Sequence, residues 1–479
     1  LKGLLPGSII DYVSISYYSR KFMNIYYTGL YPAILKMTIP FNKAVLRYEI
    51  PKGLKIKPKY SPSKAWDTGT KASRKASRAG YKTYTYTTPS GKRLKVEEAI
   101  PAPYTFLPSL FVNSGLDPEV FLKNFYFEIF TDKLIPAPIL TYFDSFSGSE
   151  DDKVKALYDD LSVNYTEDTE SDKDKSLLNI YISKKAGQLD KMRLFKAALE
   201  YWSVPHKFLI FSGISDDNTG GFFPEKISGQ GLLVQHQGEM KFVAFSQNFI
   251  PIGGEVVPMR AAYLTSDGKD YELRSNLVMG GKSGFDIEYF WDLDTGDIDL
   301  SLVFRGEYSA YKSYMFDEKT SSNIGNQIIS GFFPYVTTDE IRTIANRDNE
   351  PLKISVKGRF MRELGKGTYE LPFKAIEISG IFGIDYPRKM PLLVAQPTYQ
   401  RDVIHIKTEK KLDLRGYKEK VPGAYDYDFQ VTKTPEGYRV ERTVSIYSGI
   451  FYPSKILIIL KKAEQLDKKE EKLLRAEVK

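Results

Sequence analysis

The segment from Gly187 to Phe211 constrains the fold of this chain more than any other. Its first half predicts a helix with one buried face, because apolar side chains recur at steps of three and four residues: Leu189, Met192, Phe195, Leu199 and Trp202. The apolar run Phe208–Phe211 follows after a short turn and predicts a core strand. We therefore expect Leu189 to be buried at the start of the helix and to pack against that strand.

A glycine turn into a buried helix, followed by a strand, resembles the core of transglutaminase-like (papain-type) proteins. In that family a cysteine two residues after the glycine is activated by the helix N-terminus, and a His and an Asp on the following strands complete a triad. Here Leu189 occupies the cysteine position. Neither partner stands where the resemblance places it, at 230–233 and 241–245. The resemblance therefore implies a degenerate core without the triad.

The absence of cysteine from the whole chain bears on function independently of the resemblance. Thiolate catalysis, cysteine-zinc sites and intramolecular disulfides are excluded. Only residues 183–186 separate the preceding predicted helix from Gly187, whereas active relatives have a longer connection there. We expect this shortening to remove one wall of the catalytic cleft.

The resemblance extends to both ends of the chain. The motifs Leu5–Tyr12 and Tyr48–Pro51 resemble the N-terminal β-domain of large Gram-negative envelope proteins, and Leu371–Phe373, Tyr386–Leu392 and the basic helix from Tyr452 resemble their C-terminal β-domain. The implied fold is multidomain α+β, with β-sandwich domains flanking a degenerate transglutaminase-like core. The expected units are an N-terminal β-sandwich at 1–135, the core at 136–270, a β-rich connecting domain at 271–370 and a C-terminal β-domain at 371–479.

Composition agrees with a folded chain of several domains. Hydrophobic residues make up 42% and aromatic residues 14% of the 479 residues, which excludes general disorder. No run approaches the roughly 18 apolar residues of a membrane-spanning helix. Because the sequence opens on Leu1 in a strand-like pattern, we expect an upstream segment, such as a signal or lipid anchor. The expected location is the periplasm or the outer membrane, with peripheral association.

The basic charge of the chain is concentrated in one segment. Between Lys52 and Lys95 there are 13 Lys and Arg but one acid, Asp67. The net charge of this segment therefore exceeds the net charge of the whole chain, which is +8. Such a segment is either a solvated loop with an edge hairpin or a contact for an acidic partner. No nucleic-acid-binding motif accompanies it, so nucleic acid is not the expected partner. The candidate partner-binding residues are Lys71, Arg74, Lys75 and Arg78.

Carboxylates and histidines elsewhere give weaker signals. Asp292, Asp294 and Asp297 alternate as calcium ligands can, but the twelve-residue loop and its terminal Glu are missing, so a hairpin tip is the favoured interpretation. His236 lies in a predicted hairpin turn, and we expect His206 and His405 to be structural. No metal or cofactor is expected.

Two classes of function fit these observations. The first is a non-catalytic binding or scaffold protein that holds an envelope protein or a polyanionic glycan within a larger complex. The second is a hydrolase acting on glycan or peptide with a non-thiol site. The surroundings of Leu189 should discriminate them, since a closed apolar pocket favours the first and an open groove with convergent carboxylates the second.

Overall fold

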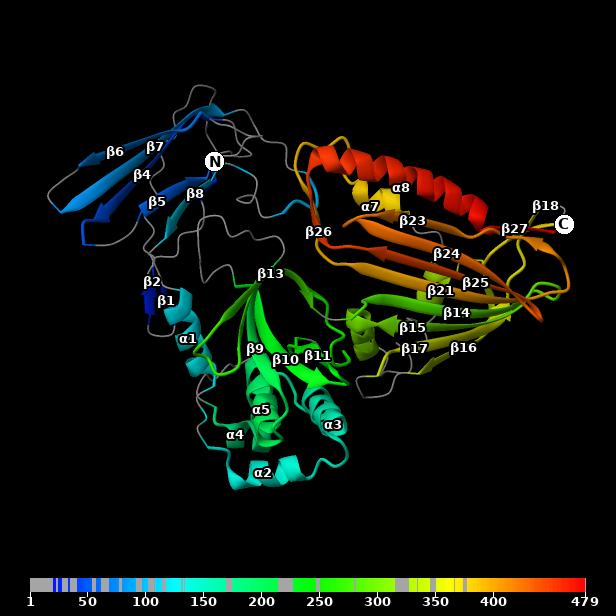
Figure 1. The fold of residues 1–479 in the computed structure, drawn as a ribbon, viewed down its shortest axis with the longest axis horizontal. Coiled ribbons are helices and arrows are strands. Elements are labelled where there is room, and N and C mark those ends of the chain that lie inside the picture. Colours follow the sequence, from blue (N-terminus) through cyan, green and yellow to red (C-terminus); the bar gives the residue numbers. More distant parts are fainter. Residues whose placement is uncertain are drawn as a thin grey trace, which may run out of the picture.

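The structure is a computed structural model, shown in Figure 1. It describes residues 20–22, 25–27, 33–34, 41–53, 57–61, 69–76, 80–91, 97–101, 107, 109–113, 118–130, 132, 134–168, 175–213, 227–246, 250–279, 281–314, 327–333, 335–344, 350–365, 367–373 and 377–478. These residues form three parts: strands up to residue 113, a helical core with a sheet over 118–279, and a large sheet with helices from residue 284 onward.

Two small sheets face each other in the N-terminal part. The first has the order β4 (Phe41–Pro51), β7 (Tyr81–Gly91), β6 (Lys71–Ala76), and the second the order β3 (Ala33–Ile34), β8 (Ser109–Asn113), β5 (Lys57–Ser61). Tyr60 of β5 packs on the cluster that Tyr84 and Tyr86 form in the first sheet. The Tyr86 hydroxyl also donates to the carbonyl of Pro58, 3.3 Å away. This arrangement agrees with the expected sandwich. A short hairpin, β1 (Arg20–Phe22) and β2 (Ile25–Tyr27), precedes it.

Five helices surround one face of a five-stranded antiparallel sheet in the core. The helices are α1 (Pro118–Ile129), α2 (Ala137–Asp144), α3 (Glu150–Val163), α4 (Leu177–Ser183) and α5 (Gln188–Tyr201). The sheet has the order β11 (Glu239–Val243), β10 (Gly229–His236), β9 (His206–Gly213), β12 (Val257–Thr265), β13 (Glu272–Met279). Helix α3 begins where its acidic start predicts, with Ser149 and Asp152 forming a capping box.

The expected boundaries of the core, at 135 and 270, are both wrong. Phe125 of α1 stacks on Phe208 of β9 with ring centroids 6.3 Å apart, so α1 belongs to the core. The boundary at 270 falls inside the hairpin of β12 and β13. That hairpin turns at Asp267 and Gly268, the latter with φ +77°, as its sequence predicts.

One eight-stranded sheet dominates the C-terminal part. Its order is β16 (Thr337–Ile344), β17 (Lys353–Arg359), β15 (Asp297–Arg305), β14 (Gly284–Asp292), β21 (Thr398–Lys407), β25 (Gly437–Ile446), β24 (Tyr425–Thr434), β23 (Tyr417–Val421). Only the central pair β14 and β21 is parallel. The expected boundary at 370 is wrong, because strands from both sides of it share this sheet and one hydrophobic core.

Helices and a small sheet cover the apolar face of this large sheet. In a β-sandwich a second sheet would cover that face, whereas here helices form much of the second layer. The covering elements are α7 (Ile378–Phe382), α8 (Pro453–Leu473) and the sheet of β18 (Glu363–Gly365), β19 (Thr368–Glu370), β27 (Arg475–Val478) and β22 (Leu412–Asp413). The 3₁₀ helix η3 (Gly306–Tyr314) and the pair β20 (Leu392–Val394) and β26 (Gly449–Phe451) complete this part. Among the described helices, none has the length and apolar character needed to cross a membrane.

A buried ion network fixes α8 to the large sheet. Arg442 of β25 has no exposed side-chain surface and donates through Nε and Nη2 to Asp402 of β21, at 2.9 and 2.6 Å. Its Nη1 donates to Glu470 of α8 at 2.8 Å. Gln400 and Tyr289 also donate to the Asp402 carboxylate. The network therefore specifies which turn of α8 lies over which strands.

Candidate functional site at the start of helix α5

Helix α5 begins at a tight turn after α4. Lys184 has the left-handed φ of +52° and ends α4, and the N–H of Ala186 donates to the carbonyl of Thr166 at 3.0 Å. Gly187 caps α5. The Asp190 carboxylate accepts the Gly187 N–H at 3.4 Å, and its charge in the first turn stabilises the helix N-terminus. The turn into a buried helix that the sequence predicts is therefore present.

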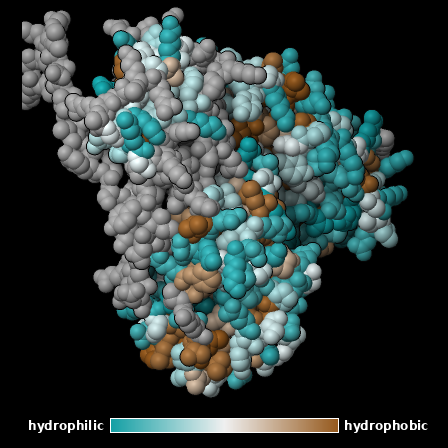
Figure 2. Space-filling model, turned by 60° about the vertical axis from the view of Figure 1, so that its left-hand side comes forward, coloured by the Kyte–Doolittle hydropathy of each residue, from teal (hydrophilic) through white to brown (hydrophobic). Residues whose placement is uncertain are grey.

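Leu189 is 39% exposed, so the prediction that it is buried against the following strand is wrong. Met192, Phe195 and Leu199 do enter the core, as the pattern predicts. Leu189 lies instead on the same face of the helix as Arg193, which follows four residues later. The partners of Arg193 are polar. Leu189 is one of several exposed apolar side chains in the part of the molecule formed by residues 118–279. Figure 2 shows apolar residues gathered at the lower end of this part.

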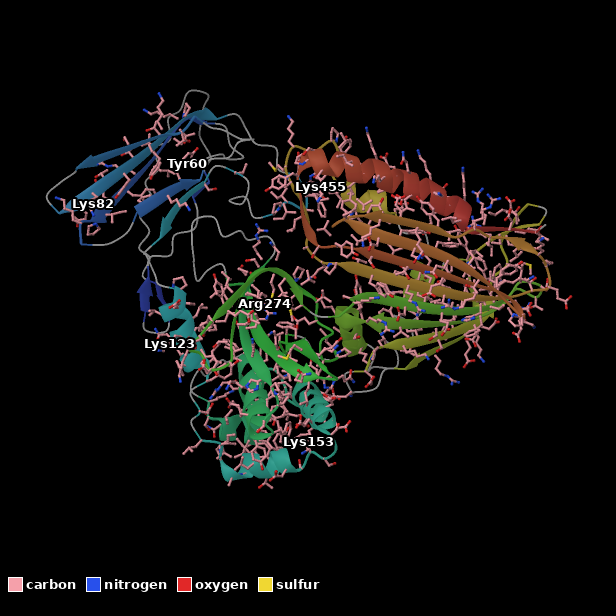
Figure 3. All side chains as sticks on the ribbon, in the orientation of Figure 1. Tyr60, Lys82, Lys123, Lys153, Arg274 and Lys455 are labelled. Atoms are coloured by element: carbon pink, nitrogen blue, oxygen red, sulfur yellow. The ribbon has the colours of Figure 1, made fainter. Side chains whose placement is uncertain are left out.

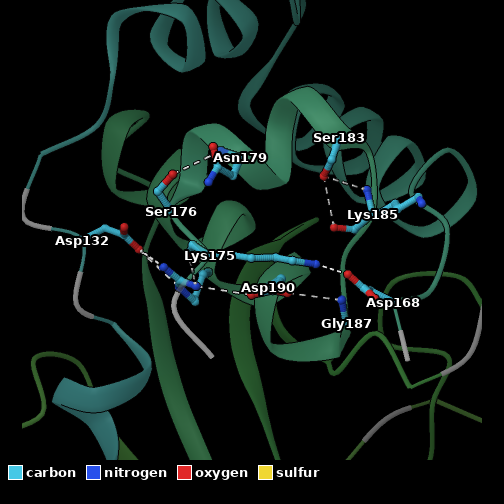
Figure 4. Close-up of polar contacts among 10 residues, drawn as sticks. Asp132, Asp168, Lys175, Ser176, Asn179, Ser183, Lys185, Gly187 and Asp190 are labelled. Atoms are coloured by element: carbon cyan, nitrogen blue, oxygen red, sulfur yellow. Dashed lines mark hydrogen bonds and ion pairs between the residues drawn. The ribbon is translucent and has the colours of Figure 1, made fainter. Parts of the chain in front are cut away.

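Ion pairs close the polar side of the helix start (Figure 4). Nη2 of the largely buried Arg193 lies 2.7 Å from Asp132 Oδ2, and its Nη1 lies 3.3 Å from Asp190 Oδ1. The same Nη1 donates to the carbonyl of Lys175 at 2.8 Å, and Lys175 pairs with Asp168. Arg193 and Lys175 thus each have a carboxylate partner on the polar side of this turn.

The strands that would carry the other two triad members are adjacent, but their side chains are apolar. Leu232 of β10 stands opposite Val243 of β11 and Phe208 of β9, and all three are buried. The positions on β10 and β11 where the resemblance places a base and an acid therefore carry apolar side chains.

Each of the three histidines has a structural setting. His236 ends β10 before the turn at Gln237 and Gly238, as predicted, and its Nδ1 lies 3.2 Å from Asp151 Oδ1. Burial lowers the pKa of His236 despite that carboxylate, and it also lowers the pKa of His206 at the start of β9. His405 stacks on Phe290 with ring centroids 4.6 Å apart, on the outer face of the large sheet. None of the three lies beside Leu189 in these contacts.

A buried lysine on α5 is a feature that the sequence analysis missed. Lys191 is only 4% exposed, and burial lowers its pKa, while the charge of Glu167 opposes that shift. Its backbone N–H donates to the carbonyl of Gly187 at 3.0 Å, but among the described residues no hydrogen bond or ion pair of its side-chain ammonium group is found. A lysine two positions after Leu189 gives no sequence signal of burial, because lysine normally lies on the exposed face of a helix.

Two carboxylates, those of Glu255 and Glu307, lie where the core joins the large sheet. Glu255 precedes β12 and hydrogen-bonds Ser246, and Glu307 of η3 accepts the N–H of Val256 at 3.2 Å. Burial raises the pKa of both carboxyls, and the charge of Glu307 raises that of Glu255 further. The Nε2 of Gln188 donates to the carbonyl of Ser246 at 3.4 Å, so this pair lies near the start of α5. Such a pair could exchange protons with a ligand.

The carboxylates considered as metal ligands form a hairpin tip instead. Asp292 accepts the N–H groups of Asp294 and Thr295, and its second oxygen lies 2.8 Å from Lys407 Nζ. Asp294 pairs with Lys410 at 2.8 Å, and Asp297 with Arg359 at 3.5 Å. Each carboxylate thus has a cation as partner, at the turn that joins the antiparallel strands β14 and β15. In the part of the chain that the structure describes, no cluster of three or more His, Asp or Glu could hold a metal ion.

Three of the four candidate partner-binding residues lie on an edge strand of the described N-terminal sheets. Lys71 is exposed at the start of β6, whose only partner among the described strands is β7. Arg74 and Lys75 belong to the same strand, and Arg78 lies outside the described residues, as does the loop 214–226. Figure 3 shows Lys82 at the end of the N-terminal sheets that points away from the rest of the molecule. The basic surface is therefore remote from α5.

The helix α5 followed by an antiparallel sheet is the arrangement expected of a transglutaminase-like core, and the predicted mixed α+β fold class is confirmed. The crystal structure of a candidate protease from Parabacteroides distasonis ATCC 8503 resembles this chain with a TM-score of 0.54 and 11% identity, over 93% of this chain and 74% of that one. At this identity the likeness shows a shared fold.

Two further structures match more weakly. One is a TGase, 13% identical over 37% of this chain and 45% of that one, and the other is a candidate cysteine protease from Cytophaga hutchinsonii, 12% identical over 52% and 80%. Both have a TM-score of 0.18, which supports no argument. No family model and no curated protein matches the sequence.

Proposed function

We propose that this protein is a non-catalytic transglutaminase-like component of the cell envelope that binds or scaffolds a protein or glycan assembly. The observation that carries the proposal is the start of α5, where Leu189 replaces the nucleophile on a retained helix and sheet. The neighbouring strands bear Leu232 and Val243 rather than a base and an acid. A core that keeps this shape without the reactive groups serves to hold other surfaces in place.

The basic segment is the surface that we assign to an acidic partner, an envelope protein or a polyanionic glycan. Its 13 cations face one acid, and the exposed Lys71 lies on an edge strand. Cations at this density along the sequence attract anionic surfaces over about 8 Å at physiological salt. We place the protein in the periplasm or on the outer membrane, as part of a larger complex.

Charge reversal tests this assignment. Purified protein is incubated with a detergent-solubilised envelope fraction, and retained proteins and glycans are quantified over a range of salt concentrations. Changing Lys71, Arg74, Lys75 and Arg78 to Glu should weaken retention strongly at low salt and leave the unfolding midpoint nearly unchanged, because exposed charges contribute little to stability. A matched control reverses four exposed lysines of α8: Lys461, Lys462, Lys468 and Lys472. Salt-independent retention, or equal loss in the control, would contradict the assignment.

A second candidate, a hydrolase with a non-thiol site, is supported by one observation. Glu255 and Glu307 are half-buried carboxylates with raised pKa values, near the start of α5. Paired carboxylates can act as acid and base in hydrolysis. The test is release of reducing ends or new amines from envelope glycan and peptide. Turnover that is lost in Glu307→Gln would favour this candidate over the scaffold.

A further inference from the structure

A cavity of about 360 Å³ lies in the C-terminal part, between the end of α8 and the segment 360–373. Five aromatic rings line it: Phe332, Phe333, Tyr335, Phe360 and Phe373. Its volume is in the range of about 300–1,000 Å³ that small-molecule sites occupy. It is remote in the sequence from α5 and from the basic segment, so neither of the sites described above accounts for it.

Three of the aromatic rings form the buried bottom of the cavity, and one ring lies at its opening to solvent. Phe333, Phe360 and Phe373 are 3, 3 and 6% exposed, whereas Tyr335 is 59% exposed. The guanidinium of Arg442 lies 5.1 Å from the ring centroid of Phe373, so the buried ion network supports the floor from behind. Phe333, Phe360 and Phe373 are therefore part of the hydrophobic core, and the exposed ring of Tyr335 borders the open side of the cavity.

Charged groups of both signs surround these rings. The guanidinium of Arg362 lies 4.0 Å above the Tyr335 ring, and its Nη1 is 2.6 Å from Glu370 Oε2. Glu471 and Arg475 also line the cavity. Both are exposed, and neither has an ion-pair partner among the described residues. Two guanidinium groups and two carboxylates balance in charge, so the cavity attracts neither a polyanion nor a polycation.

We propose that this cavity binds a neutral sugar ring of a glycan, which rests on the proposed function and names a ligand class for it. A pyranose has apolar C–H faces that pack on aromatic rings. Its hydroxyls need both donors and acceptors, which Arg475 and Glu471 supply. An apolar peptide side chain would instead exclude water from these charged groups without replacing their hydrogen bonds, at a cost. The mixed lining therefore fits a polyhydroxylated ring better than an apolar one.

The experiment is isothermal titration of the full chain with three neutral oligosaccharides: maltotetraose, cellotetraose and tetra-N-acetylchitotetraose. At least one should bind saturably. Tyr335→Ala should weaken that binding roughly 2- to 10-fold, the equivalent of one aromatic contact. Arg475→Gln should weaken it as well. Tyr452→Ala is the matched control, since Tyr452 is similarly exposed, at 57%, and does not line the cavity.

Absence of binding to all three sugars, or equal binding by wild type, Tyr335→Ala and Arg475→Gln, would overturn the proposal. Retention of envelope components is measured on the same preparations. If retention persists while sugar binding is absent, the scaffold function stands and the cavity assignment fails. If sugars bind and are also cleaved, the cavity remains a sugar site and the non-catalytic function is contradicted.

Discussion

The buried network around Arg442 gives a sharp prediction, because Arg442→Met removes one cation and leaves two carboxylates behind. Arg442, Asp402 and Glu470 are 0, 0 and 3% exposed as side chains. Both carboxylates are therefore shielded from solvent in the folded protein and rely on the guanidinium to balance their charge. We expect Arg442→Met to destabilise the docking of α8 on the large sheet far more than an ordinary substitution.

The magnitude follows from the two buried carboxylates that lose their cation. Breaking a buried ion pair by removing one partner costs about 3–5 kcal/mol. A tenfold change in an equilibrium corresponds to about 1.4 kcal/mol, so opening of α8 should become roughly 100- to 5,000-fold more frequent. The loss is a large fraction of the about 5–15 kcal/mol that stabilise a typical domain.

Hydrogen exchange read by mass spectrometry measures this opening. Peptides of α8 and β25 should lose protection, while peptides of α5 in the core should not. Arg439→Met is the control, since Arg439 is on the same strand but pairs with Glu441 at a partly exposed position. Replacing all three buried charges by Met and Leu should recover most of the protection. Unchanged protection of α8 in Arg442→Met would refute the reasoning.

Three further predictions concern the core. Leu189→Cys should form no acyl-enzyme with ester substrates by mass spectrometry, because no base orients the thiol and accepts its proton, although the helix N-terminus favours the thiolate; covalent acylation would contradict this. Lys191→Met should raise the unfolding midpoint at pH 7 by the equivalent of about 1 kcal/mol, since a buried charge is removed. Lys185→Met is its control, because Lys185 is exposed. A lower midpoint for Lys191→Met would mean that the Lys191 ammonium group is well paired. Burial raises the pKa of Glu307, so the stability that its carboxyl contributes is present below the unfolded pKa of about 4.3 and is lost as pH rises through the raised pKa. Glu307→Gln should flatten that part of the stability curve, and identical curves for both proteins would disprove the shift.

Local sequence signals predicted helices and turns correctly where residues within the helix or turn itself determine its structure. The step of three and four residues placed α5 correctly, and Gly268 and Gly296 marked hairpins because they supply the positive φ of the turn. The acids after Ser149 marked the start of α3. In each case the signal and the structure it specifies lie within a few residues of each other.

Signals that depend on distant partners were not available in the sequence. The exposure of Leu189 is decided by Arg193 and its contact with Asp132, which lies 61 residues away. The electrostatic effect of Glu307 on Glu255 is likewise non-local. The domain boundary at 370 failed for the same reason, since nothing within the strands tells which strand will be their neighbour. The resemblance supplied the order of the parts but not these contacts.

The central parallel pair of the large sheet has a consequence for how the chain acquires its structure during synthesis. β14 ends at Asp292, and its parallel neighbour β21 begins only at Thr398. Until the ribosome has delivered β21, one edge of β14 has no partner, and an open edge with an apolar face is prone to aggregate. Fragments cut near residue 370 should therefore be insoluble on both sides of the cut. This part of the molecule must complete its folding late, after most of its length has been made.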